Sequence, residues 1–149
     1  MKLRAAIIGA VTLSALALSA AAPALAETDT HGGRPLTATL SGANELTNGD
    51  PTGTGSAIVR INPGLGEICY TLTVSGLEGT VVAAHIHIGP ASVNGPVVVP
   101  LAAPVSGSSS ACVTVSTDLA HDIVNNPSGY YVNVHTSVRP GGAIRGQLE

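Results

Sequence analysis

Three histidines occupy positions that would place their side chains on one face of a β-sheet. His85 and His87 are two residues apart in an apolar run, so a strand directs both to the same side, about 7 Å apart along the chain. In a second run, His135 shares its strand face with Tyr131 and Asn133. Imidazole nitrogens bind copper and other borderline cations. His85, His87 and His135 therefore form a hypothetical copper site.

The same spacing also has a structural interpretation. Each histidine would then hydrogen-bond the backbone of a nearby turn and hold the end of its strand in place. Strands offer the i, i+2 spacing freely, so spacing alone does not separate the two interpretations. Two further histidines, His31 and His121, lie outside these runs, and we expect neither to affect metal binding.

The two cysteines occupy matching positions in two predicted strands. Cys69 and Cys112 both alternate with aliphatic residues that would face the core. Two cysteines in an exported chain usually form a disulfide, and a bridge between neighbouring strands would close a loop of about 44 residues. In the chain-entropy model such a loop stabilises the fold by roughly 4 kcal/mol. We expect the bridge; the alternative is two free thiols.

The sequence gives little support for nucleic-acid binding or catalysis. The 149-residue chain carries 6 Lys+Arg against 9 Asp+Glu, which argues against a nucleic-acid partner because such proteins show a basic surplus. The sequence has no G-x-S-x-G, P-loop, H-E-x-x-H or C-x-x-C motif. It therefore favours a binding or structural protein over an enzyme.

The N-terminal segment predicts export. Lys2 and Arg4 precede a run without charge that ends in Ala24-Leu25-Ala26, the small-x-small pattern of a signal-peptidase site. We expect residues 1–26 to be a cleaved signal peptide, residues 27–35 a flexible leader and residues 36–149 the folded domain. A retained membrane anchor is the alternative. The cleaved protein would be secreted, extracellular or in the cell envelope, with no membrane anchor.

Short apolar runs separated by Gly/Pro/Asn/Ser clusters predict an all-β domain. The chain is 44% hydrophobic but only 2% aromatic, with 18 Gly and 10 Pro. Residues 117–126 look helical, with Asp118 as a candidate cap and Pro127 as the stop. The predicted fold is an antiparallel Greek-key sandwich or barrel of about eight strands with one short helix. The expected strands are 36–40, 55–61, 67–74, 81–88, 96–101, 111–116, 130–136 and 143–148.

Several motifs resemble the CHRD (chordin-type) domain family. They are LTATLSGANE near the start, GEICYTLTVSGL, the A-H-I-H-x-G block, the Y-V-N-V-H-T block and the closing G-x-I-R-G-Q-L. The resemblance covers residues 36–149 and implies an extracellular all-β module, immunoglobulin-like or barrel-like. It brings no biochemical activity with it, and the ligand stays unknown.

A more distant resemblance is to the copper/zinc superoxide dismutase family, an eight-stranded Greek-key barrel. That family binds copper through an H-x-H pair and a later V-H histidine, and an arginine near its C-terminus guides the anion. The similar positions here are His85, His87, His135 and Arg145. Residues 89–120 contain no histidine, so the bridging and zinc ligands have no counterpart. The resemblance implies, as an alternative to a non-enzymatic module, a mononuclear copper protein.

Overall fold

The computed structural model describes residues 32–149, which form an antiparallel sheet of eight strands in the order β5-β4-β7-β8-β1-β2-β3-β6. The predicted signal peptide, most of the predicted leader and His31 lie outside the described residues. Every predicted strand is present. The strands are β1 (Arg34–Ser41), β2 (Thr54–Asn62), β3 (Glu67–Ser75), β4 (Val81–Ile88), β5 (Val97–Leu101), β6 (Ser108–Thr114), β7 (Tyr130–Thr136) and β8 (Arg139–Gln147).

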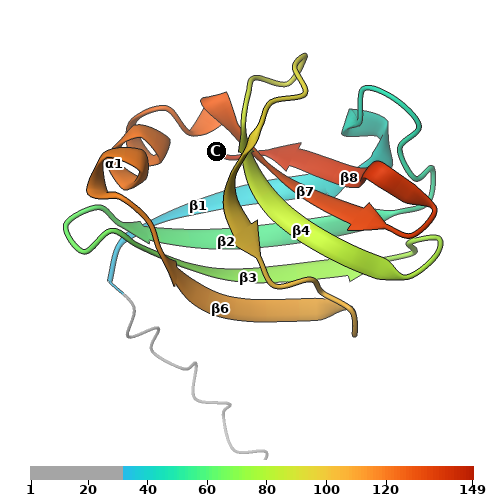
Figure 1. Cartoon of the computed structure of the whole chain (residues 1–149), viewed down its shortest axis with the longest axis horizontal. Coiled ribbons are helices and arrows are strands. Elements are labelled where there is room, and N and C mark those ends of the chain that lie inside the picture. The colour runs from blue at the N-terminus through green and yellow to red at the C-terminus, as the bar shows by residue number, and fades with distance from the viewer. Residues whose placement is uncertain (1–31) are drawn as a thin grey trace, which may run out of the picture.

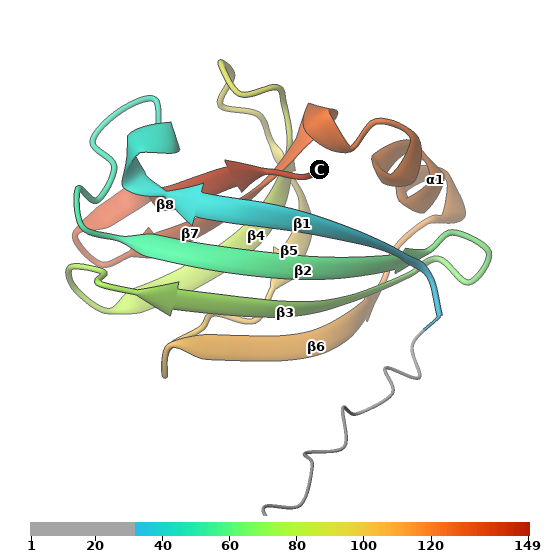
Figure 2. The same ribbon diagram turned by 180° about the vertical axis from the view of Figure 1, so that it is seen from behind.

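The sheet curls into a nearly closed barrel with two layers. We call β1, β2, β3 and β6 the hydroxyl layer, after the Ser and Thr residues on its outer side, and β4, β5, β7 and β8 the histidine layer. Figures 1 and 2 show the two layers on opposite sides of the molecule, with the helix at one end. β3 pairs with β6 although the β4–β5 hairpin separates them in the chain, a Greek-key connection. The predicted fold class is confirmed.

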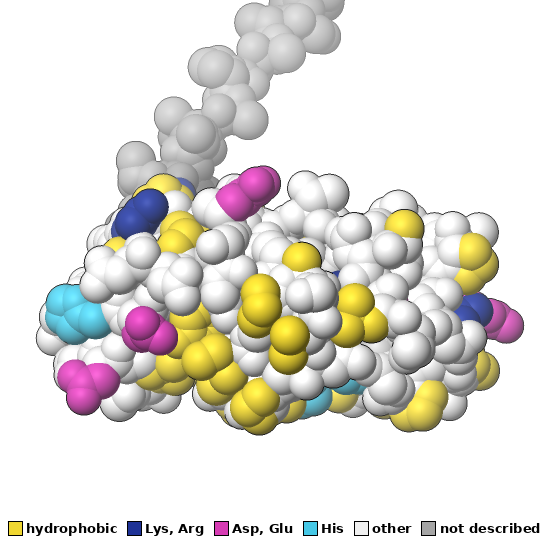
Figure 3. Space-filling model, turned by 90° about the horizontal axis from the view of Figure 1, so that it is seen from above, with side chains coloured by type: hydrophobic (Ala, Val, Ile, Leu, Met, Phe, Trp, Pro, Cys, Tyr) yellow, Lys and Arg dark blue, Asp and Glu magenta, His cyan; other side chains and the backbone are white. Residues whose placement is uncertain are grey.

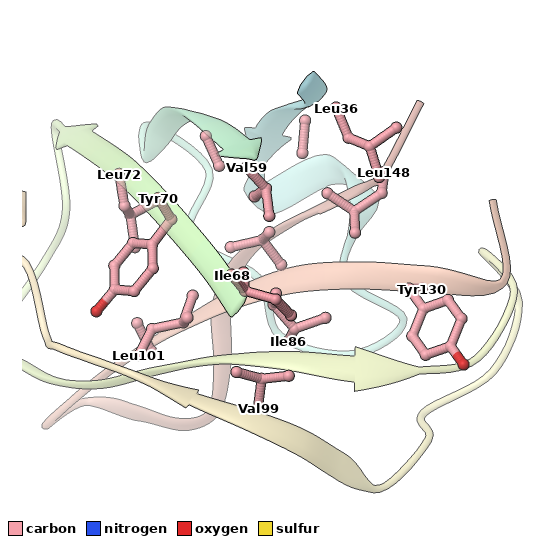
Figure 4. Packing of buried hydrophobic residues seen from close by; sticks show 14 of the residues in the cluster. Leu36, Val59, Ile68, Tyr70, Leu72, Ile86, Val99, Leu101, Tyr130 and Leu148 are labelled. Carbon is pink, nitrogen blue, oxygen red and sulfur yellow. The ribbon is translucent and has the colours of Figure 1, made fainter. Parts of the chain in front are cut away.

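Strand alternation builds the core between the layers. Leu72 and Val59 of the hydroxyl layer and Ile86 and Val132 of the histidine layer are fully buried. Figure 4 shows side chains from both layers meeting in this cluster. With no Phe or Trp in the chain, aliphatic side chains fill most of the core. Tyr70 links β3 to the segment after β5, because its hydroxyl accepts a 2.6 Å hydrogen bond from the Ala102 N–H.

Several strand boundaries differ from the prediction. β6 begins at Ser108 and β8 at Arg139, ahead of the expected residues 111 and 143, so the serine run and the RPGG segment belong to strands. A two-residue connection, Ser137 and Val138, joins β7 to β8, so the Gly-Pro composition of 139–142 falls within a strand. β1 also starts at Arg34, ahead of the predicted Leu36.

One α-helix, α1 (Thr117–Asn125), lies where the sequence predicts it. Its N-cap is Ser116, whose hydroxyl accepts a 3.2 Å hydrogen bond from the Leu119 N–H, and not the predicted Asp118, which lies in the first turn. Short 3-10 turns occur at η1 (Gly42–Asn44) and η2 (Pro127–Gly129). None of the described helices has the length and apolar content that a membrane crossing requires.

The predicted disulfide is present. Cys69 and Cys112 are directly opposite each other on β3 and β6, and their sulfurs are bonded at 2.03 Å. The bridge ties the hydroxyl layer together at its edge strand.

Candidate metal centre

The three histidines of the two predicted strands meet on the outer side of the histidine layer. β4 and β7 pair antiparallel, with Ala83 opposite His135 and His85 opposite Asn133. One ring nitrogen from each histidine lies within 4.8 Å of those of the other two. The facing nitrogens of His85 (Nδ1) and His135 (Nε2) are 3.2 Å apart. The strand phases read from the sequence therefore bring these imidazoles together.

Backbone carbonyls fix the tautomers of two of these rings. His87 Nδ1 lies 2.9 Å from the Gly95 carbonyl oxygen, and His135 Nδ1 lies 3.0 Å from that of Pro140. A carbonyl oxygen only accepts hydrogen bonds, so each Nδ1 carries the proton and each Nε2 is unprotonated; the Nε2 of His135 faces His85 Nδ1. Metal-binding histidines generally use the second nitrogen in this way.

The Nε2 atom of His87 is buried and has no hydrogen-bond partner. A buried polar atom without a partner loses the free energy of its lost hydration. A metal ion between His85, His87 and His135 would remove this deficit, and it would replace the contact between His135 Nε2 and His85 Nδ1.

The environment of the three imidazoles favours their uncharged form. Burial is the largest cause that lowers the pKa of His85, and the neighbouring His135 and His87 lower it further. Burial also lowers the pKa of His87 and of His135, against the opposing effect of their carbonyl hydrogen bonds. Neutral imidazole is the form that binds a metal. His85 is half-buried whereas His87 and His135 are buried, so the cluster opens to solvent on the His85 side.

Tyr131 and Arg145 extend the site. The Tyr131 ring stacks on His87 with centroids 4.9 Å apart and an angle of 11° between the planes. The guanidinium carbon of Arg145 lies 3.5 Å from the centroid of the same ring. Because β4 and β8 flank β7, Tyr131 lies between His87 and Arg145. The superoxide dismutase resemblance gave Arg145 the role of guiding an anion, but its side chain is only 1% exposed.

The donors of Arg145 hold the loop of residues 89–96 instead. They contact the carbonyl oxygens of Pro90 and Val93 and the side-chain oxygen of Asn94. The Gly95 N–H in the same loop donates a 3.1 Å hydrogen bond to the Tyr131 hydroxyl. Arg145 thus fixes the loop whose Gly95 carbonyl orients His87.

Sequence reasoning missed this loop and its anchors. It placed residues 89–95 only between two expected strands, and it identified Arg145 only through a resemblance. A Cβ at Gly95 would lie 1.6 Å from the carbonyl oxygen of Ile88, so the loop passes too close to β4 for any side chain there. The high Gly and Pro content of the residues that follow His87 was the available signal, but composition does not predict where the loop lies in space.

Two other groups do not add to the centre. Glu67, Cys69 and Cys112 lie close together, but both cysteine sulfurs are used in the disulfide. His121 is exposed on α1, away from the cluster that joins β4 and β7. On the face drawn in Figure 3, charged side chains are few.

Comparison with known proteins identifies the family. The CHRD domain model matches residues 36–148, nearly all of the described chain. The chain belongs to the CHRD domain family. Chordin from Danio rerio is 31% identical to this CHRD domain over 116 residues, which cover 76% of the chain. The match spans only 12% of that chordin. No solved structure matches this CHRD domain at a significant level.

Proposed function

We propose that this chain is an exported, non-enzymatic CHRD module that binds one copper ion through His85, His87 and His135. The observation that carries the copper site is the pair of imidazoles, His87 and His135, whose Nδ1 atoms are held by backbone carbonyls and whose unprotonated Nε2 atoms lie close to the His85 ring. Three neutral nitrogen donors form a set that copper accepts. Family membership and the N-terminal sequence support the extracellular location.

The donor set favours copper over zinc. Nitrogen sites follow the Irving–Williams order, in which Cu(II) binds more tightly than Zn(II). Structural zinc sites generally supply four protein ligands, and this cluster supplies three. We therefore expect competition between the two ions to leave Cu(II) in the site.

We assign no turnover to this site. Arg145 is buried behind Tyr131, so its guanidinium cannot contact an anion that approaches the three histidines, as the more distant resemblance would require. A purified sample loaded with copper should show no more superoxide turnover than the His135→Ala variant. A clear excess over that variant would instead support the superoxide-dismutase-like alternative.

The copper site is tested by ligand-induced stabilisation of the exported protein. Cu(II) at 100 times its dissociation constant should raise the free energy of unfolding by about 2.7 kcal/mol, because the ion binds only the folded state. His85→Ala and His135→Ala should each abolish the gain. His121→Ala, a change of the same type on the exposed face of α1, should leave it intact. A gain that survives in both site variants would refute the proposal.

Export is tested on the same material. The mature protein should begin at Glu27, after the Ala24-Leu25-Ala26 pattern. N-terminal mass spectrometry of protein recovered outside the cell measures this. A chain that retains Met1 in the membrane fraction would contradict the export.

A further inference from the structure

A positive charge lies buried behind the three histidines. Arg145 is 1% exposed, and its guanidinium carbon lies 3.5 Å from the centroid of the Tyr131 ring. The other neighbour of that ring is His87, stacked at 4.9 Å. Arginine stays protonated in proteins, so the centre lies in the field of a permanent cation, on the order of 10 Å away.

Within residues 32–149, none of the groups that accept a hydrogen bond from this guanidinium carries a negative charge. Its hydrogen-bond acceptors are the carbonyls of Pro90 and Val93 and the amide side chains of Asn94 and Gln147. Arg139, by contrast, pairs with the carboxylates of Asp50 and Glu78.

One carboxyl does interact electrostatically with Arg145, but it compensates the charge poorly. Burial raises the pKa of Glu45 to about 7, although Arg145 acts in the opposite direction. The raised pKa favours the protonated, uncharged form of Glu45, so this carboxyl compensates the charge of the guanidinium only in part.

This potential acts on any metal ion held by the cluster. Three imidazoles contribute no negative charge, and no carboxylate or thiolate from the described residues joins them in the cluster. A nearby cation repels a doubly charged ion more than a singly charged one. Cu(II) also prefers a tetragonal set of N and O ligands, whereas this cluster supplies three nitrogens.

We infer that the three-histidine centre binds copper in the cuprous state in preference to the cupric state, and that the buried charge of Arg145 contributes about tenfold to this preference. The magnitude follows from Coulomb's law at roughly 10 Å and an effective dielectric constant of about 20. The inference rests on the proposed copper binding and deepens it, because it specifies the oxidation state that the site retains.

The test compares the affinities of one protein for the two ions. Competition with bicinchoninate under anaerobic reducing conditions gives the dissociation constant for Cu(I), and competition with nitrilotriacetate gives that for Cu(II). The informative variant is Asn94→Asp, because the Asn94 side-chain oxygen already accepts a 3.1 Å hydrogen bond from Arg145. This isosteric change adds a compensating negative charge without removing the guanidinium or its contacts to the loop.

Asn62→Asp is the matched control. Asn62 lies at the end of β2, where its side-chain oxygen accepts a hydrogen bond from the Leu65 N–H, a role that aspartate also fills. Both variants therefore add one negative charge at an existing acceptor, but only Asn94→Asp places it against Arg145.

The wild-type protein should bind Cu(I) more tightly than Cu(II). Asn94→Asp should shift the ratio of the two dissociation constants about tenfold towards Cu(II), which equals a fall of about 59 mV in the reduction potential of the bound copper. Asn62→Asp should leave the ratio unchanged.

Tighter Cu(II) binding in the wild type, or an equal ratio in the two variants, would overturn the inference. An equal loss of affinity for both ions in Asn94→Asp would show that Arg145 only holds the loop, and would overturn it too. If neither ion binds the wild type, the proposed copper binding itself is refuted.

Discussion

The outward-facing side chains are exposed in one layer of the barrel and buried in the other. In the hydroxyl layer, Thr39, Ser56, Thr73 and Ser108 are opposite one another across all four strands, and all are exposed. In the histidine layer, the outward positions of β7 are buried, including Tyr131, Asn133 and His135. The same alternation of apolar and polar residues thus gives a solvated face in one layer and a covered polar cluster in the other.

This difference separates what stabilises the fold from what forms the site. Polar groups on the hydroxyl layer are hydrated, and this layer also carries the disulfide. Burial of polar side chains destabilises a fold unless they find hydrogen-bond partners. The buried polar side chains of the histidine layer therefore lower the stability of the barrel. His87 Nε2 and the Asn133 side-chain oxygen are buried without hydrogen-bond partners. We attribute the presence of these unpaired polar atoms to metal binding.

The largest expected effect concerns the disulfide of the hydroxyl layer. Replacing both Cys69 and Cys112 with serine should lower the free energy of unfolding by about 4 kcal/mol, because the unfolded chain loses a constraint on a long loop. Copper affinity should change by less than about twofold, since the histidines lie in the other layer. Urea denaturation and copper titration of the double variant measure both quantities. A parallel fall in copper affinity would show that the layers are not independent.

In the histidine layer, Gly95→Ala should have the next largest effect. The new methyl group would lie 1.6 Å from the Ile88 carbonyl oxygen, so we expect a loss of about 2–3 kcal/mol from overpacking. Copper affinity should fall at least about tenfold, since displacement of the Gly95 carbonyl releases His87 from its orienting contact. Denaturation and copper competition are the measurements.

Gly141→Ala is the matched control for Gly95→Ala. Gly141 follows Pro140, whose carbonyl orients His135, but a Cβ there meets no atom within 4 Å. The change in stability should stay within about 0.5 kcal/mol. Equal losses in the two alanine variants would contradict the role given to the loop of residues 89–96.

A smaller effect is expected from pH at Glu45, whose Oε1 atom is buried without a partner. Because burial raises its pKa to about 7, the folded protein keeps a proton that the unfolded chain releases near pH 4.5. The contribution to stability is full below pH 4.5 and is lost as pH rises through about 7. Glu45→Gln should therefore gain about 1 kcal/mol relative to the wild type between pH 4.5 and pH 8, less than the full pKa shift implies because the side chain is only half-buried and solvent screens its charge.

Denaturation curves at the two pH values test this prediction. Glu149→Gln, at an exposed side chain, serves as the control and should follow the wild type. If Glu45→Gln loses stability with rising pH as steeply as the wild type does, another group carries the dependence.

The smallest effect belongs to the exposed hydroxyl row. Thr73→Val removes a 2.8 Å contact with the Ser56 hydroxyl, but both side chains are exposed and water replaces the lost partner. Valine also suits a strand, so we expect a change within about 0.5 kcal/mol. A loss above about 1.5 kcal/mol in thermal denaturation would show that this layer depends on its hydroxyl contacts.

The sequence predicted the features that depend on the alternation of side chains along each strand. Alternation placed Cys69 and Cys112 on the strand faces that point away from the core. It also placed His85 and His87 on one side of their strand, as a site shared with His135 requires. It did not predict the start of β8 at Arg139, because the Gly-Pro composition there indicates a turn when read without the hairpin that contains it. The stack of Arg145 on Tyr131 was also not predictable, because these residues meet only through the register of β7 and β8 and the path of a distant loop.

The central claim is that three imidazoles hold one copper ion, and the most direct test is a crystal structure of the copper-loaded protein with anomalous scattering measured at the copper edge. The account predicts one strong peak about 2 Å from His85 Nδ1, His87 Nε2 and His135 Nε2. The Nδ1 atoms of His87 and His135 should remain bonded to the carbonyls of Gly95 and Pro140. A peak at His121 alone, or no peak among the three histidines, would contradict the account.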